Sequence, residues 1–436
     1  MKPQDDKSSR EARRNFLKTG ALAGSSLLAA GSIVGRAHAS ENGQIRVGVV
    51  GCGGRGKGAL TNALDANPDV HIVALADLFA DRLHETVVSF SKHKKYSERF
   101  DATAENCYDG FDCCEKMIAE NKLDAIILAS PPHYRPDHLE AAINAGLHVF
   151  CEKPVATDPV GVRRVRAACE LADKKGLNIV SGLCWRYDAG VRATVEQVMN
   201  GAIGDIVTTQ ADYLTGPVWT KSKQPGESEM EYQCRNWYYY TWLSGDHVLE
   251  QFIHSLDKAI WIRGDVPPAK AYGTGGRELR DDLTQGNIFD HFSICYEWAD
   301  GTRTFATTRQ YRGCMNQTED FIFGSEGTSK LLAHTIDGPK PWQFKGDKIS
   351  MYVQEHKELY EAIQGKRPRI NNGGYMCDST LMGILGREVC YSGQEISWEQ
   401  VVNSPQDLRP AKYEFADEYA PPSEVPHPGR YRMPLA

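Results

Sequence analysis

The sequence predicts an α/β protein: an N-terminal domain built on a doubly wound parallel sheet, then an α+β domain with an open, largely antiparallel sheet. Three observations predict this arrangement. A strand, a glycine-rich loop and a helix follow one another from Ile45 to about Ala66. Strand-like and helix-like segments then alternate as far as Ser181, the order expected of a parallel sheet. After Trp185 the alternation ends, and short runs separated by glycines indicate antiparallel strands.

The composition indicates a class of protein and excludes some partners. The chain has 436 residues, of which 41% are apolar and 25% charged, so it is typical of a globular protein with two domains. Its net charge is -7 and no long basic block occurs, which argues against nucleic acid as a partner. The longest apolar stretch is shorter than the roughly 20 residues of a membrane helix, so we expect no membrane partner.

The first 39 residues have the features of an export signal. Arg13-Arg14-Asn15-Phe16-Leu17-Lys18 is a twin-arginine pattern, an apolar run from Thr19 to Val34 follows, and Ala37-His38-Ala39 fits a cleavage site. The pattern predicts a signal peptide over 1–39 and a mature protein in the periplasm. Because this pathway exports folded proteins, a dinucleotide bound in the cytoplasm could leave with the chain.

The first strand and the loop after it predict a dinucleotide site. Ile45–Val50 is a short β-rich run, and it leads into Gly51-Cys52-Gly53-Gly54-Arg55-Gly56, a match to G-x-G-x-x-G. The glycines allow a tight turn and a close approach of the pyrophosphate, and the following helix presents its N-terminus to the phosphates. We therefore predict a Rossmann domain over 45–185, with all six loop residues binding the cofactor.

Asp77 indicates which dinucleotide is bound. It ends the next strand, Val70–Ala76, and lies 26 residues after Gly51, near the spacing of the acidic residue that holds the ribose hydroxyls. A carboxylate repels a 2′-phosphate, so Asp77 favours NAD. Arg82 lies close enough in sequence to leave NADP open.

Further polar residues follow the later strands. Strands are predicted at Asp124–Ala129, Leu147–Cys151 and Leu177–Ser181, with helices at His133–Ala145 and Asp158–Lys175. Ligands of parallel sheets bind outside the carboxyl ends of the strands. We therefore expect these residues to join the cofactor crevice: Ser130, Pro131, His133, Glu152 and Lys153.

The segment from Gly245 to Ile262 predicts an amphipathic helix with an unusual polar face. His247, Glu250, His254 and Asp257 follow helical spacing on one side, opposite the apolar residues Val248, Leu249, Phe252, Ile253 and Leu256. We expect His247, Glu250 and His254 to contact substrate, with Trp185, Arg186 and Tyr240 as further contacts. A metal held by the two histidines and the glutamate is the alternative for this face, although the spacing is not H-E-x-x-H.

The second domain is expected over 186–405 and an extended arm over 406–436. Strands are predicted at Ile206–Tyr213, His291–Trp298, Thr302–Gln310 and Asp320–Phe323, and late helices at Tyr352–Gln364 and Tyr375–Tyr391 are expected to pack on the first domain. The arm either wraps a neighbouring subunit or is a loose tail. The twelve cysteines lack regular spacing and mostly resemble buried apolar residues, with one or two disulfides left open.

Several of these motifs together resemble the glucose–fructose oxidoreductase / inositol dehydrogenase / MocA (Gfo/Idh/MocA) family. They are the glycine loop, Ser130-Pro131, Ala145-Gly146-Leu147-His148-Val149 and Cys151-Glu152-Lys153-Pro154. The resemblance runs from about Ile45 to Val401 and is nearest to exported members.

The resemblance implies roles for particular residues. Lys153 would lie beside the nicotinamide and the substrate hydroxyl, and His254 would be the acid/base, with Glu250 in place of the family's Asp. Arg135 stands where the family often has His. The resemblance also implies a homo-oligomer, formed through the open sheet.

The leading hypothesis is a periplasmic enzyme with a tightly bound NAD that oxidises or reduces a CH–OH group of a sugar, polyol or glycoside. A redox-neutral NAD-dependent glycoside hydrolase or lyase, working by transient oxidation and elimination, is the alternative. A non-catalytic sugar-binding or sensing protein is a further alternative.

Overall fold

A computed structural model describes residues 43–280 and 283–436 of the chain. The predicted signal peptide, 1–39, lies outside the described residues. Within them, no helix is long and apolar enough to cross a membrane. All twelve cysteines are free thiols; only Cys314 is exposed, and ten are buried.

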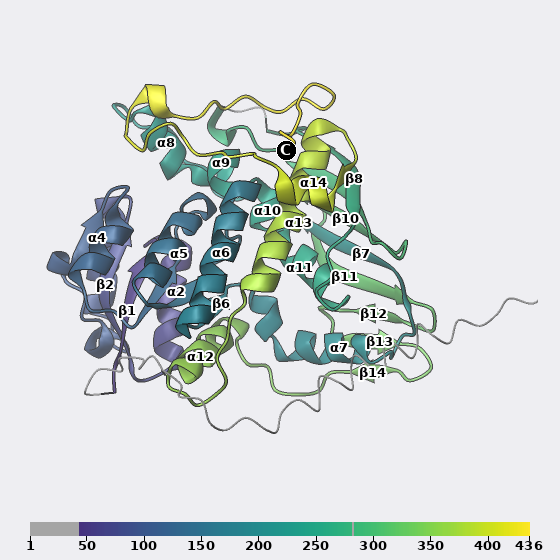
Figure 1. The fold of residues 1–436 in the computed structure, drawn as a ribbon, viewed down its shortest axis with the longest axis horizontal. Helices are drawn as coiled ribbons and strands as arrows, with labels where there is room; N and C mark the ends of the chain where they lie inside the picture. Colours follow the sequence, from purple (N-terminus) through teal and green to yellow (C-terminus); the bar gives the residue numbers. More distant parts are fainter. Residues whose placement is uncertain (1–42, 281–282) are drawn as a thin grey trace, which may run out of the picture. The chain divides into compact units, whose positions relative to one another are not determined.

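The first sheet has six parallel strands in the order β3-β2-β1-β4-β5-β6 (Figure 1). Their bounds are β1 Ile45–Val50, β2 Val70–Asp77, β3 Cys107–Asp109, β4 Ala125–Leu128, β5 His148–Cys151 and β6 Ile179–Ser181. The predicted parallel sheet is confirmed. β4 and β5 are wholly buried, as strands covered on both faces by helices must be. The chain order reverses between β1 and β4, so the crevice for a ligand opens there.

Helices cover both faces of this sheet. They are α2 Gly54–Ala66, α3 Ala80–Ser91, α4 Cys113–Glu120, α5 Arg135–Asn144 and α6 Pro159–Lys175. Residues of α2 and α3 share one apolar cluster with Leu359 and Tyr360 of the late helix α12, Met351–Ile363. Residues of α4, α5 and α6 share the other cluster with α13, Gly373–Ser392.

The second sheet has nine strands in the order β14-β13-β12-β11-β7-β10-β9-β8-β15. β7 and β10 are parallel, and the other pairs are antiparallel, so the sheet is mixed and largely antiparallel, as predicted. The bounds are β7 Ile206–Thr215, β8 Lys270–Gly276, β9 His291–Glu297, β10 Arg303–Gln310, β11 Gln317–Gly324, β12 Thr328–Lys330, β13 Thr335–Asp337, β14 Trp342–Gln343 and β15 Ile396–Ser397.

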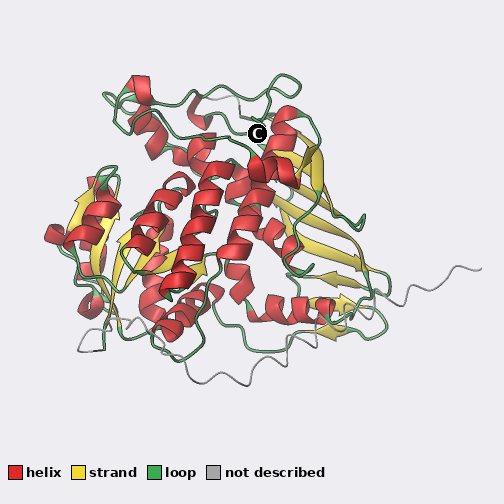
Figure 2. Cartoon of the chain, in the orientation of Figure 1, coloured by secondary structure: helices red, strands yellow, loops and turns green. Residues whose placement is uncertain are grey.

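Helices gather on one side of the second sheet (Figure 2). The bounds of the remaining helices are α7 Ala189–Met199, α8 Glu229–Arg235, α9 Thr241–Ser244, α10 His247–Glu250, α11 Ile253–Trp261 and α14 Trp398–Asn403. Apolar residues of α10, α11 and α13 form one core with the inward side chains of the sheet. The opposite face exposes Tyr272, Phe305 and Phe323.

The C-terminal segment lies against its own chain. Leu408 N–H donates to Asp158 at the start of α6, and the Tyr413 hydroxyl bonds His133. Farther along, Tyr431 bonds Glu388 of α13. The segment therefore lies over helices of both domains (Figure 1, yellow), a third arrangement beside the two expected of it.

Candidate active site

The glycine loop joins β1 to α2 at the edge of the first sheet where the strand order reverses. Gly51 has φ +91°, and a Cβ there would lie 2.5 Å from Ser130 N, against the end of β4. A Cβ on Gly56 would lie 1.6 Å from the Gly51 carbonyl oxygen. Only glycine allows this close approach of strand, loop and helix. The result places the N-terminus of α2 over the crevice.

Asp77 closes the loop from the end of β2. Its Oδ2 accepts the Cys52 N–H at 2.7 Å, and its Oδ1 accepts the Phe79 N–H at 2.9 Å. Burial raises the pKa of this carboxyl, while Arg82 and the two N–H groups lower it. The carboxylate is therefore rigidly held at the place where a ribose would lie.

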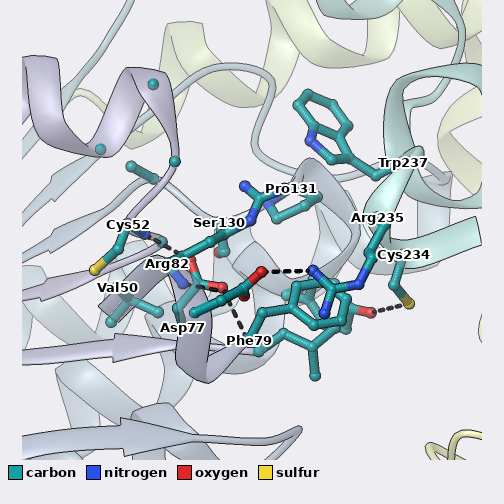
Figure 3. A pocket seen from close by; sticks show the side chains of 18 of the residues that line it. Val50, Cys52, Asp77, Phe79, Arg82, Ser130, Pro131, Cys234, Arg235 and Trp237 are labelled. Carbon is teal, nitrogen blue, oxygen red and sulfur yellow. Dashed lines mark hydrogen bonds and ion pairs between the residues drawn. The ribbon is translucent and has the colours of Figure 1, made fainter. Parts of the chain in front are cut away.

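A cavity of about 610 Å³ opens over these residues (Figure 3). Its first wall contains nine of the predicted cofactor residues, which are the six residues of the glycine loop, Asp77, Ser130 and Pro131. Arg82 lines the same wall. Its second wall comes from the other domain and includes Trp219, Lys221, Gln224, Arg235 and Trp237. The close-approach glycines, the helix N-terminus and the carboxylate fit a dinucleotide, so these residues would hold its pyrophosphate and adenosine.

The other three residues predicted for the cofactor, His133, Glu152 and Lys153, do not line this cavity and have protein partners. His133 Nε2 bonds the Tyr413 hydroxyl at 2.8 Å, and burial lowers its pKa to about 4. Glu152 Oε1 pairs with Arg55 Nε at 3.0 Å. Arg55 belongs to the glycine loop, so this ion pair ties the loop to the end of β5.

Lys153 and Glu250 meet beyond the end of β5. The lysine Nζ contacts Glu250 Oε1 at 2.9 Å and donates to the Glu250 main-chain oxygen at 2.5 Å. Both side chains are 14% exposed, so the pair is mostly shielded but reachable. The structure thus brings together two of the three predicted catalytic residues, from different domains.

The single helix predicted from Gly245 to Ile262 is wrong. The structure has two helices, α10 and α11, separated at Gln251 and Phe252. Phe252 N–H bonds the His247 carbonyl five residues back, and His254 N–H bonds Gln251 instead of Glu250. Such bulges are common at functional sites. Here the bulge frees the Glu250 carbonyl, which accepts the Lys153 ammonium group.

His254 follows the break on the first turn of α11. Its Nδ1 is buried and has no hydrogen-bond partner within the described residues. Burial lowers its pKa well below the usual value, and the charges of Lys153 and Lys258 lower it further. A neutral imidazole is the form that accepts a proton.

His247 lies in the core and does not contact Lys153, unlike Glu250 one turn later on α10. It is fully buried, and its Nδ1 lies 3.1 Å from both Asp246 Oδ1 and the Phe289 carbonyl. Its ring contacts the edge of Phe292. No group of three metal-ligating side chains that could hold an ion occurs among the described residues, so the metal alternative has no support here.

None of the predicted catalytic or substrate residues lines the cavity, and Trp185, Arg186 and Tyr240 have protein partners elsewhere. Arg186 is buried in ion pairs with Asp257 and Asp265. Trp185 lies under the Lys258 ammonium, 4.9 Å from ring centroid to Nζ. Tyr240 belongs to an aromatic cluster, edge-on to Tyr232.

Sequence reasoning left the role of Arg135 open and missed the place of Glu355. Arg135, on the first turn of α5, is buried and donates to the Pro154 carbonyl, directly after Lys153. Glu355 of α12 is fully buried, and neither carboxylate oxygen has a hydrogen-bond partner in the part of the chain that is described. The burial of Glu355 depends on the tertiary structure, so no local sequence pattern could have predicted it.

Glu355→Gln is expected to stabilise the protein at neutral pH. Burial and nearby Glu152 raise the pKa of Glu355 well above its usual value, although Arg55 lowers it. Below the pKa of the unfolded state, about 4.5, such a carboxyl is protonated in both states and does not destabilise the fold. As pH rises from there towards the pKa of the folded state, the unfolded state loses its proton first, so the free energy of unfolding falls. Glutamine has no proton to lose, so Tm should rise by about 2 °C or more at pH 7.5.

Thermal unfolding of both proteins from pH 4.5 to 8 measures this effect. The advantage of Glu355→Gln should widen with pH, whereas Glu361→Gln on the same helix should run parallel to the wild type. A constant difference between Glu355→Gln and the wild type would contradict the stated cause.

Comparisons with known proteins agree with this geometry. Residues 45–182 match the family model described as GFO_IDH_MocA, an oxidoreductase family with an NAD-binding Rossmann fold. The chain is 23% identical over 283 residues to an inositol 2-dehydrogenase of Rhizobium meliloti, covering 65% of this chain and 74% of that protein. It is 25% identical over 351 residues to a glycosyl hydrolase family 109 protein of Stenotrophomonas maltophilia, covering 76% and 70%.

Among solved structures, the fold resembles the WlbA dehydrogenase of Bordetella pertussis, which was crystallised with NADH and UDP-GlcNAcA. The TM-score is 0.62 at 19% identity, and the match covers 81% of this chain and 98% of that one. At this identity the likeness concerns the fold.

Proposed function

This chain belongs to the Gfo/Idh/MocA oxidoreductase family, and we propose from that premise that it oxidises or reduces a CH–OH group of a sugar, polyol or glycoside with a tightly bound NAD. The observation that carries the proposal is the Lys153–Glu250 pair, to which each domain supplies one partner. Lys153 lies next in sequence to Glu152, which the ion pair with Arg55 ties to the glycine loop. When bound, NAD supplies the hydride acceptor.

Lys153, His254 and Glu250 have different roles in the transfer of the substrate's hydroxyl proton. His254, held neutral by burial and two lysines, takes the proton from the carbinol hydroxyl. Lys153 stabilises the developing alkoxide and passes the proton on. Glu250 holds the lysine through a carboxylate and a main-chain oxygen, so its role is to position Lys153. The sequence pattern instead predicts that Glu250 contacts substrate.

Asp77→Asn is expected to lower NADH affinity about tenfold or more, because a charge-assisted hydrogen bond to the ribose is worth about 1.5–3 kcal/mol. NADPH affinity should stay unchanged or rise, since the change removes a charge that repels the 2′-phosphate. The measurement is titration of the mature protein with each reduced cofactor, followed by nicotinamide fluorescence. Asp109→Asn, at the end of the neighbouring strand, is the matched control; an unaltered NADH affinity in Asp77→Asn would exclude Asp77 from the ribose site.

A redox-neutral NAD-dependent glycoside hydrolase or lyase is the second candidate, and the likeness to a family 109 glycosyl hydrolase favours it. Transient oxidation of a ring hydroxyl would make the adjacent C–H acidic, elimination would follow, and the hydride would return. For glycosidases of this kind the family resemblance implies T-H-G in the helix motif, where this chain has Phe252-Ile253-His254. That departure places the hydrolase second. A sugar-binding or sensing protein is third, because Lys153, Glu250 and His254 are all retained.

Location and assembly belong to the same proposal. The twin-arginine pattern supports export to the periplasm with the cofactor in place. The uncovered face of the second sheet, where Tyr272 and Phe305 flank Cys295 on adjacent strands, supports a homo-oligomer.

The experiment begins with the mature protein purified without added cofactor. Denaturation should release about one NAD(H) per chain, identified by mass. The loaded protein is then offered myo-inositol, D-glucose and nitrophenyl glycosides, with and without an electron acceptor. Acceptor-dependent oxidation supports the dehydrogenase, whereas cleavage of a glycoside without acceptor supports the hydrolase. Absence of both bound dinucleotide and binding on titration would overturn the proposed function and favour the sensing protein.

A further inference from the structure

The second wall of the dinucleotide cavity comes from a segment without any recognisable motif. Residues 216–228 run from β7 to α8, and they contribute Trp219, Lys221, Gln224 and Glu227 to the lining. Arg235, the last residue of α8, completes this wall. The adenosine end of the crevice is therefore covered by the other domain of the same chain.

Arg235 connects that cover to the strand end that carries Asp77. Its Nη1 pairs with Asp81 Oδ2, on the first turn of α3, at 3.1 Å. Its guanidinium carbon lies 3.9 Å from the centre of the Phe79 ring, two residues beyond Asp77 (Figure 3). Glu227 and Glu231 hold the same guanidinium from its own domain, each at 3.3 Å. Arg235 thus bridges the two walls of the cavity.

The C-terminal segment reinforces the bridge. Phe415 stacks on Phe79, with ring centroids 5.8 Å apart and planes 7° from parallel. Glu229 N–H donates to Asp417 Oδ1 at 2.6 Å, which ties α8 to the same segment. Phe79 is consequently 6% exposed although it follows a strand end at the mouth of the cavity.

We propose that Arg235, Phe79 and the C-terminal segment around Phe415 form a latch that retains the dinucleotide between turnovers. The inference rests on the proposed function, because it assumes a dinucleotide in this cavity. Release of the adenosine half requires α8 to separate from α3, which breaks the Arg235–Asp81 pair and uncovers Phe79. Asp81 is 60% exposed, so the pair is weak and sensitive to salt, as a contact that opens and closes can be.

The test measures how fast bound NADH leaves the full mature protein. Protein loaded with NADH is mixed with excess NAD, and the loss of bound-nicotinamide fluorescence gives the dissociation rate. Arg235→Met and Asp81→Asn should each raise this rate about two- to fivefold, the effect expected of a partly exposed ion pair. The double variant should raise it little further, because both changes remove one shared contact. Raising NaCl from low to high concentration should accelerate release from the wild type and have little effect on Arg235→Met.

Arg303→Met is the matched control, since it removes an exposed arginine–glutamate pair on the second sheet, away from the cavity lining. Tm and NADH stoichiometry are recorded for every variant, so that loss of fold is separated from loss of the latch. Equal rates in the wild type, Arg235→Met and Asp81→Asn would overturn the latch while leaving the proposed function intact. A wild-type protein that binds no NADH would overturn both.

Discussion

Lys153→Met is expected to reduce sugar oxidation by about 10²- to 10⁴-fold, the usual contribution of a positioned acid/base group, while the protein keeps its dinucleotide. The lysine contacts Glu250 and lies outside the lining of the glycine-loop cavity. Its loss should therefore affect the chemical step and leave cofactor content unchanged. The measurement combines single-turnover absorbance with myo-inositol or D-glucose, released NAD(H) per chain, and Tm.

Lys153→Arg separates charge from proton transfer. Arginine keeps the positive charge and can donate to Glu250, but it does not release a proton in proteins. If the lysine relays the proton, Lys153→Arg should be nearly as slow as Lys153→Met. Near-wild-type turnover in Lys153→Arg would reduce the role of Lys153 to electrostatics, and turnover above about a tenth of wild type in Lys153→Met would remove it from the mechanism.

Glu250→Gln adds a third comparison. The main-chain contact from Glu250 to Lys153 survives this change, whereas the ion pair is lost. We expect a smaller fall in turnover than for Lys153→Met, because the lysine stays partly held.

The first domain could be predicted from the sequence because its signals are local. A glycine at φ +91°, a strand before it and an acid at the end of the next strand are all set by neighbouring residues. The crevice follows from the order of parallel strands. The cofactor wall formed by Gly51–Gly56 and Asp77 was accordingly placed by sequence alone.

The second half of the site depends on partners distant in sequence. Helical spacing from His247 to Asp257 predicts one continuous face, but the bulge at Phe252 is stabilised by Lys153, about a hundred residues away. His247 belongs to the core because a main-chain carbonyl from Phe289 satisfies it. Residues 216–228 line the cavity without any periodicity that could have marked them. In each case the structure depends on a contact between residues that are far apart in the sequence.

Arg186→Met is expected to destabilise the protein by about 3–5 kcal/mol, enough to lower Tm by about 5 °C or more. The guanidinium contacts both oxygens of Asp257 at 3.0 Å, pairs with Asp265 at 2.6 Å, and lies over the rings of Tyr375 and Trp261. Without it, Asp257 is a charge with 1% exposure, and the Ser379 hydroxyl is its remaining hydrogen-bond donor among the described residues.

The variant Arg186→Met/Asp257→Asn shows whether this buried charge is the cause. Removing the orphaned carboxylate should restore a large part of the lost stability, since residues in direct contact are not additive. Thermal and urea unfolding of the two variants and the wild type measure it. The sequence suggested instead that Arg186 contacts substrate. In that event Arg186→Met would keep its Tm and raise KM. Tm and KM together therefore decide between an arginine that holds α11 and α13 together and an arginine that contacts the sugar.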